Sequence, residues 1–182
     1  MNRLVKVKNK DDIFNIYKNT PISKLLEYHN FGETKDGIND AELIIGTCMD
    51  NRVQLNIPKN FAYVIRTGGS NLHNSSFYVS YALSASGVKT IALIVHSDCG
   101  MVNLGGRKEK IVNGIIKVTG WKKIYAEDYF KSYAPICEIV NEVTFAISEV
   151  KRLREIYPTV LIAPLLYNVE DDLLYLIDDE QA

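Results

Sequence analysis

The sequence predicts an α/β fold in which a mostly parallel central sheet is flanked by helices and carries a C-terminal antiparallel edge hairpin. Three apolar runs rich in Ile and Val have the composition of parallel strands covered on both faces: 43–48, 61–65 and 91–95. A helical apolar stripe at 75–86 joins the last two runs into one β-α-β unit. Two later runs, at 160–167 and 173–177, lie so close in sequence that they form an antiparallel hairpin.

The first forty residues are polar and are expected to be helical. Asp11 and Asp12 can open a short helix, and Pro21 can begin another, because proline favours the first helical position. Gly87 is expected to end the helix that precedes the third strand. We therefore expect a single domain over 1–182, with an N-terminal helical arm at 1–40 and an α/β core at 41–182.

The second half of the chain is expected to contain three more helices. A Gly-rich turn after Cys99 leads into two of them, at 112–118 and 121–133. The stretch 139–157 shows the clearest helical period, with apolar residues three or four apart and basic residues near its C-terminal end. The two strands of the edge hairpin follow this last helix.

Composition and charge exclude several classes of function. Hydrophobic residues make up 47% and charged residues 24% of the chain, and a net charge of −1 gives no field that would attract nucleic acid or an anionic membrane. Met1–Lys10 lacks the apolar core of a secretory signal, and 160–167 is too short to span a membrane. Three cysteines suggest no disulfide framework, so we expect a cytoplasmic protein.

Three side chains that bind zinc well follow two of the predicted strands. Cys48 ends the first strand, and His96 and Cys99 come directly after the third. The carboxyl ends of neighbouring parallel strands share one edge of the sheet, so these residues can meet although they are far apart in sequence. Two thiolates and one imidazole leave one tetrahedral position open, which is the arrangement of a catalytic zinc site.

Asp50 and Arg52 follow Cys48 at intervals of two residues, and such residues share a face of an extended segment. Arg52 can hold the Asp50 carboxylate through a forked hydrogen bond. The remaining carboxylate oxygen can then accept a proton from water on the zinc ion, whose pKa the metal lowers to about 7. Asp50 and Arg52 are therefore the expected catalytic pair.

These residues resemble the beta-class carbonic anhydrases, which carry Cys-x-Asp-x-Arg and His-x-x-Cys. The two motifs stand here as Cys48–Arg52 (Cys-Met-Asp-Asn-Arg) and His96–Cys99 (His-Ser-Asp-Cys). The segment Ala62–Arg66 is similar to the family strand that precedes an Asn-Ala-Gly sequence, and Gly100 follows the second zinc cysteine as it does in the family. The resemblance covers 43–177, and the residues of the two motifs are most similar to those of the compact prokaryotic branch.

The resemblance implies that Cys48, His96 and Cys99 bind Zn²⁺ and that Asp50 and Arg52 are catalytic. The implied activity is the reversible hydration of carbon dioxide to bicarbonate by a zinc-bound hydroxide. A homodimer or an oligomer built from dimers is also implied, and no nucleic-acid or membrane partner is expected.

Two departures from the family keep other functions open. Thr67-Gly68 stands where the family usually has Asn-Ala, in a loop that shapes the pocket, and 105–135 is longer and more helical than in many members. The same fold branch includes hydrolases of carbonyl sulfide and carbon disulfide, whose chemistry uses the same ligands. A third alternative is a non-catalytic zinc-binding protein, which would need a fourth protein ligand.

Several other residues have plainer interpretations. Cys137 is expected to be an inert apolar residue, and His29 and His73 to be surface or capping residues. His73 is the better candidate for proton transfer, because it follows the loop after the second strand. Asp98 is expected to be a turn residue rather than a ligand.

Two further features are not expected to bind nucleotides or nucleic acid. The segment 105–108 (Gly-Gly-Arg-Lys) lacks both the phosphate-loop spacing and the dinucleotide fingerprint. Tyr125, Tyr129 and Tyr133 have no basic stripe beside them, so they are expected to pack a helix or a subunit contact.

Overall fold

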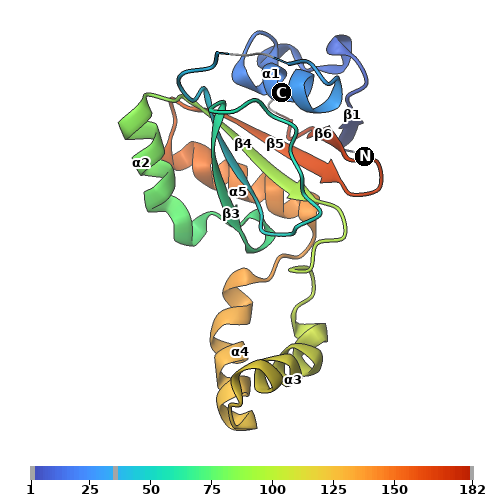
Figure 1. The fold of residues 1–182 in the computed structure, drawn as a ribbon, viewed down its shortest axis with the longest axis vertical. Helices are drawn as coiled ribbons and strands as arrows, with labels where there is room; N and C mark the ends of the chain where they lie inside the picture. Colours follow the sequence, from blue (N-terminus) through green and yellow to red (C-terminus); the bar gives the residue numbers. More distant parts are fainter. Residues whose placement is uncertain (1–2, 35–36, 181–182) are drawn as a thin grey trace.

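The computed structural model describes residues 3–34 and 37–180. Within these ranges a six-stranded mixed sheet has the order β1-β6-β5-β4-β2-β3 (Figure 1). The strands are β1 Leu4–Lys6, β2 Leu43–Cys48, β3 Ala62–Thr67, β4 Thr90–His96, β5 Leu161–Asn168 and β6 Leu173–Ile177. Strands β3, β2, β4 and β5 are parallel, whereas β6 and β1 are antiparallel to their neighbours. The predicted fold class is confirmed.

Helices cover both faces of the sheet, and two of them extend away from it. The α-helices are α1 Pro21–Asn30, α2 Ser76–Ser86, α3 Lys108–Thr119, α4 Lys123–Cys137 and α5 Glu142–Ile156. The 3₁₀ turns are η1 Lys10–Asp12, η2 Asn15–Tyr17, η3 Gly68–Ser70, η4 His73–Ser75 and η5 Gly105–Arg107. Helix α1 packs on one face and α2 and α5 on the other, while α3 and α4 form a hairpin that projects from the body (Figure 1).

Local sequence signals explain where the helices begin and end. Thr20 caps α1 by accepting a hydrogen bond from the Ile22 amide at 3.2 Å, directly before the proline of the first turn. Asn141 caps α5 by accepting a bond from the Thr144 amide at 2.9 Å. Helix α2 ends at Gly87, whose φ of 70° lies in the left-handed region that glycine enters without steric cost.

Alternating strand residues form two hydrophobic cores, one on each face of the sheet. Ile45 and Ala92 belong to the core that includes α1, whereas Ile44 and Leu93 belong to the core that includes α2 and α5. All four side chains are fully buried. Strands buried on both faces are typical of parallel sheets, and they hold their carboxyl ends rigidly.

The N-terminal region differs from its expected all-helical structure. Leu4–Lys6 forms β1, which pairs with β6, so β1 and not the C-terminal hairpin is the outermost strand. Where a helix was expected at Asp11, the structure has two 3₁₀ turns. Asn9 and Asp12 form a capping box around the first turn, and the extended backbone of Ile13 ends it. The division into an arm at 1–40 and a core at 41–182 stays a prediction. No described helix is both long and apolar enough to cross a membrane.

Candidate metal centre

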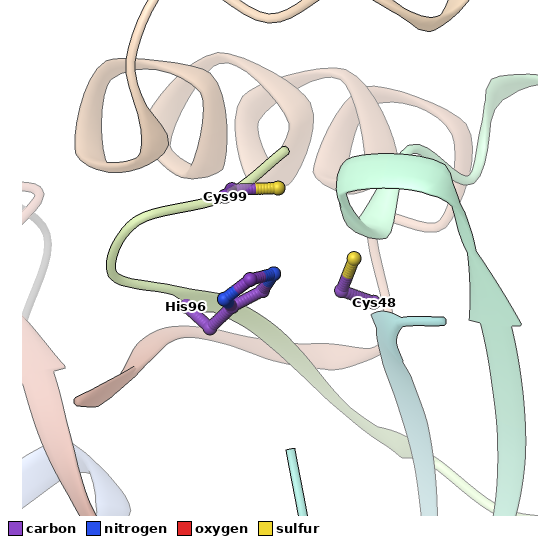
Figure 2. Close-up of side chains that lie close together, drawn as sticks. All are labelled: Cys48, His96 and Cys99. Carbon is purple, nitrogen blue, oxygen red and sulfur yellow. The ribbon is translucent and has the colours of Figure 1, made fainter. Parts of the chain in front are cut away.

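Three soft or borderline ligands converge where the chain leaves β2 and β4. The two strands are neighbours, with Thr47 opposite Ile94, so Cys48 and His96 end adjacent strands at the same edge. The connection after β2 leads to β3 on one side, and the connection after β4 leads to β5 on the other, which opens a crevice between them. Cys99 follows in the next turn, and the ligand atoms of all three side chains lie within 4.8 Å of one another (Figure 2).

The imidazole of His96 is oriented for ligation. Its Nδ1 lies 2.9 Å from the carbonyl oxygen of Ser97, and because a carbonyl can only accept, Nδ1 carries the proton. Nε2 is buried and has no hydrogen-bond partner among the described residues. A buried polar atom without a partner is costly, and a backbone carbonyl that accepts a hydrogen bond from the other ring nitrogen is typical of metal-bound histidine.

The two cysteine sulfurs shift each other's pKa in opposite directions. The neighbouring Cys99 thiol lowers the pKa of Cys48 to about 4, assisted by His96 and by the Gly69 amide. The Cys48 sulfur, together with burial, raises the pKa of Cys99. Burial lowers the pKa of His96, but the nearby Cys48 sulfur and its negative charge outweigh burial and raise the pKa overall. The centre thus carries negative charge that suits a divalent cation.

A carboxylate held by a guanidinium borders the three ligands. Arg52 donates from its backbone N and its Nε to Asp50 Oδ1, at 2.9 and 3.1 Å, and from Nη2 to Asp50 Oδ2 at 2.8 Å. The Arg52 side-chain bond is the main reason why the pKa of Asp50 is lowered to about 2. Asp50 Oδ2 lies 3.9 Å from His96 Nε2. Asp50 is therefore an anion at neutral pH beside the nitrogen that faces the site.

This geometry corrects two expectations about the pair. The segment after Cys48 does not remain extended, because the Val53 amide bonds to the Asp50 carbonyl at 3.2 Å and closes a turn. Arg52 also occupies both oxygens of Asp50 instead of leaving one free. Each carboxylate oxygen has two lone pairs, so Oδ2 keeps the capacity to accept another proton donor.

Asp98 is a turn residue, as expected, with a φ of 56°, and it also supports the pair. Its Oδ2 accepts a hydrogen bond from Arg52 Nη1 at 2.8 Å, and its carbonyl accepts one from Nη2 at 2.9 Å. The Arg52 guanidinium is thus fixed between the two ligand-bearing loops. In the sequence, Asp98 was notable only for its position between His96 and Cys99, and that position did not predict its contact with Arg52.

Two further residues that the sequence did not single out brace the ligands. Glu142 Oε1, in the first turn of α5, accepts a hydrogen bond from the backbone N–H of Cys99 at 3.0 Å. Arg66 Nη1 donates to the Cys48 carbonyl at 2.9 Å, and its Nη2 donates to the Val53 carbonyl at 3.0 Å. Both contacts join distant segments, so no local pattern could have identified them.

The loop after β3 forms a further wall of the site. Met49 N–H bonds to the Thr67 carbonyl at 2.8 Å, which ties this loop to the segment after Cys48. A Cβ at Gly68 or Gly69 would lie 3.2 or 3.1 Å from Met101, so the two glycines make room for that side chain. Met101 also packs with the apolar cluster around Cys48 and Cys99. The site is therefore apolar on this side and charged on the Asp50 side.

The other singled-out residues lie outside this cluster. His29 is in α1, where its Nδ1 accepts a bond from the Asn56 amide at 3.0 Å, and His73 is exposed at the start of η4. Cys137 is half-buried at the end of α4. The exposed rings of Tyr129 and Tyr133 contact each other on α4 in a tilted arrangement, with ring centroids 4.6 Å apart.

The donor set fits a zinc ion. Two thiols and one imidazole nitrogen with no other partner are the ligand types that zinc prefers, and the described residues add no fourth His, Cys, Asp or Glu to the group. A non-catalytic structural site would need that fourth ligand. Cys48, His96 and Cys99 could hold the metal while one coordination position stays open.

Comparisons with known proteins identify the fold. The chain matches no protein-family model and no curated protein sequence. It is similar to the beta-carbonic anhydrase isoform I of Trichomonas vaginalis, with a TM-score of 0.65 and 19% identity over 92% of this chain and 100% of that chain. A carbonic anhydrase from Glaciozyma antarctica gives a TM-score of 0.60 and 20% identity, over 89% of this chain and 98% of that chain.

A carbon disulfide hydrolase in its apo form is similar to the same extent, with a TM-score of 0.57 and 23% identity over 93% of each chain. The chain therefore has the fold that beta-carbonic anhydrases and this hydrolase share, which confirms the resemblance at the level of the fold. The prokaryotic branch stays a prediction.

Proposed function

We propose that this chain is a zinc-dependent lyase that hydrates carbon dioxide reversibly to bicarbonate. One observation carries the proposal: Nε2 of His96, which has no hydrogen-bond partner among the described residues, lies beside two thiols and an arginine-held carboxylate, in a fold that carbonic anhydrases share. Cys48, His96 and Cys99 are the proposed ligands. A bound zinc ion would supply a Lewis acid that lowers the pKa of water to about 7.

The protein groups around the metal position supply orientation and proton handling. Asp50 is anionic, so it can accept a hydrogen bond at Oδ2, on the side that faces His96. Arg52 keeps Asp50 ionised and in place, and Asp98 keeps Arg52 in place. The apolar side chains near the two cysteines, which include Met101 and Ile139, suit an apolar substrate such as carbon dioxide.

The test combines metal analysis with stopped-flow carbon dioxide hydration on one preparation. We expect about one zinc per chain and a rate that scales with zinc content. Asp50→Asn should keep the zinc and lose about 10²- to 10⁴-fold in turnover, because it removes the proton acceptor. Asp128→Asn, on the exposed side of α4, is the matched control and should hydrate carbon dioxide at the wild-type rate. Full turnover by the Asp50 variant would remove Asp50 from the mechanism.

Hydrolysis of carbonyl sulfide or carbon disulfide is the second candidate. It is favoured by the Thr67-Gly68 loop, which stands where carbonic anhydrases of the family usually have Asn-Ala, and Gly68 of this loop lies against Met101 beside the site. Hydrogen sulfide release, measured beside carbon dioxide hydration, decides between the two substrates. No sulfide release would end this candidate, and zinc binding without either activity would favour a non-catalytic zinc protein.

Assembly and location follow only from the family resemblance and the sequence. We propose a homodimer or an oligomer built from dimers, which analytical ultracentrifugation of the zinc-loaded protein tests. A cytoplasmic location likewise stays a prediction.

A further inference from the structure

A cavity outside the metal centre, here called the hairpin cavity, lies between α3, α4 and the segment 100–107. Its volume is about 610 Å³, which is within the usual range of small-molecule sites. Figure 1 shows α3 and α4 projecting from the body as a pair, joined to it by the segment between β4 and α3 and by the segment between α4 and α5. Gly100 and Met101 line the cavity, so it directly adjoins the loop that carries Cys99.

The interior of the hairpin cavity is apolar. Leu104 and Phe130 are buried in the small core of the hairpin, and Ile111, Ile115 and Ala134 pack against them while also lining the cavity. These side chains come from the segment before α3, from α3 and from α4, so they form apolar walls on several sides of the cavity. Such a surface favours an aliphatic or aromatic group over a fully hydrated one.

The edge of the hairpin cavity is cationic. Arg107 and Lys110 line it, and no carboxylate of the described residues does so. In the part of the chain that the structure describes, neither cation forms a salt bridge. Arg107 Nη1 donates to the Gly100 carbonyl at 3.1 Å, and a guanidinium has five N–H donors, so the others are available to a ligand. Tyr129 and Tyr133 also line the cavity.

We propose that the hairpin cavity binds a small amphipathic carboxylate. Its apolar chain would lie between α3 and α4, and its carboxylate would bind Arg107 and Lys110. A planar carboxylate matches the guanidinium fork, and one negative charge complements a lining whose described residues include two cations and no carboxylate. Arg107 bonds to the carbonyl of Gly100, the residue that follows Cys99. Ligand binding at Arg107 is therefore expected to alter the environment of the metal centre.

Isothermal titration at pH 7.5 with octanoate tests the proposal. Acetate lacks the apolar chain and 1-octanol lacks the charge, so each should bind at least about tenfold more weakly than octanoate. The double variant Arg107→Gln/Lys110→Gln should lose at least about tenfold in octanoate affinity, because charge-assisted hydrogen bonds are lost. Lys117→Gln, on α3 but outside the cavity lining, is the matched control and should bind as the wild type does.

A second variant tests the cavity itself. Ala134→Trp should fill the space and abolish octanoate binding, with thermal unfolding measured to establish that the variant is folded. Equal octanoate affinity of wild type and the double Gln variant would overturn the proposal, as would the absence of binding to the wild type. Sedimentation that shows a dimer broken by Ala134→Trp would also overturn it, because the cavity would then be an interface between two copies.

This proposal is independent of the proposed lyase activity. Octanoate binding is measured on zinc-free and on zinc-loaded protein, and Arg107 and Lys110 are not among the proposed ligands or catalytic residues. A protein without carbon dioxide hydration but with charge-dependent octanoate binding would therefore contradict the lyase proposal alone.

Discussion

Glu142 offers the sharpest test of how the fold holds the third proposed ligand. Its Oε1 accepts the backbone N–H of Cys99 at 3.0 Å, and Cys99 is buried with an exposed fraction of 2%. Glu142→Ala removes the acceptor and leaves that N–H without its partner, whereas Glu142→Gln keeps an oxygen at the same place. The two variants therefore separate loss of this hydrogen bond from loss of the side-chain charge.

The size of the effect follows from the cost of the unpaired amide. A buried donor that loses its partner costs about 1–3 kcal/mol. Metal binding needs Cys99 in its native position, so the whole cost is the upper bound on the loss of binding free energy. At about 1.4 kcal/mol for each factor of ten, zinc affinity should fall about 5- to 150-fold in Glu142→Ala. Loss of a hydrogen bond that holds a metal ligand in place typically has an effect of this order, about 10- to 100-fold.

Zinc affinity by chelator competition at fixed pH is the assay. Thermal unfolding of the zinc-free variants measures any general loss of stability separately. Glu142→Gln should stay close to the wild type, with Glu142→Ala clearly weaker. An alanine variant within twofold of wild type, or a glutamine variant as weak as the alanine variant, would refute the role of the hydrogen bond.

Two further predictions concern packing and pH. Gly46→Ala should reduce stability by about 1–3 kcal/mol in urea unfolding, because its Cβ would lie 2.6 Å from Leu72 Cδ1 in the core. Gly114→Ala, where nothing lies within 4 Å, should instead stabilise by about 0.5–1 kcal/mol, and equal effects at both sites would contradict the packing argument. Burial raises the pKa of Asp171, but hydrogen bonding, chiefly from Lys6, outweighs burial and lowers it from 3.8. A lowered folded-state pKa stabilises the protein above 3.8, and this contribution is lost as the pH falls through the lowered value. Asp171→Asn should therefore be less stable at pH 7 and lose less stability on acidification, and a pH profile parallel to the wild type would count against this.

The sequence predicted those parts of the molecule that local patterns encode. Continuous apolar runs indicated β2, β4 and β5, because strands covered on both faces need no polar alternation. Cys48 and His96 could be placed at one edge because parallel neighbours end together. Strand β1 was missed because three residues are too few to show a period, and only its pairing with β6 makes it a strand.

The contacts that brace the site were beyond sequence reasoning for the same reason. Glu142 and Cys99 are separated by 43 positions, and the whole α3–α4 hairpin lies between them. Arg66 likewise holds segments on both sides of the Asp50 turn, which the expectation of an extended segment did not include. Tertiary hydrogen bonds of this kind depend on where whole elements pack, and no spacing rule encodes them.

Zinc K-edge X-ray absorption of the metal-loaded protein tests the central claim most directly. Ligation by Cys48, His96 and Cys99 with one open position predicts two sulfur neighbours at about 2.3 Å and two nitrogen or oxygen neighbours at about 2.0–2.2 Å. Cys99→Ser should remove one of the two sulfur neighbours. A wild-type spectrum without sulfur neighbours, or one unchanged in the Cys99 variant, would contradict the account.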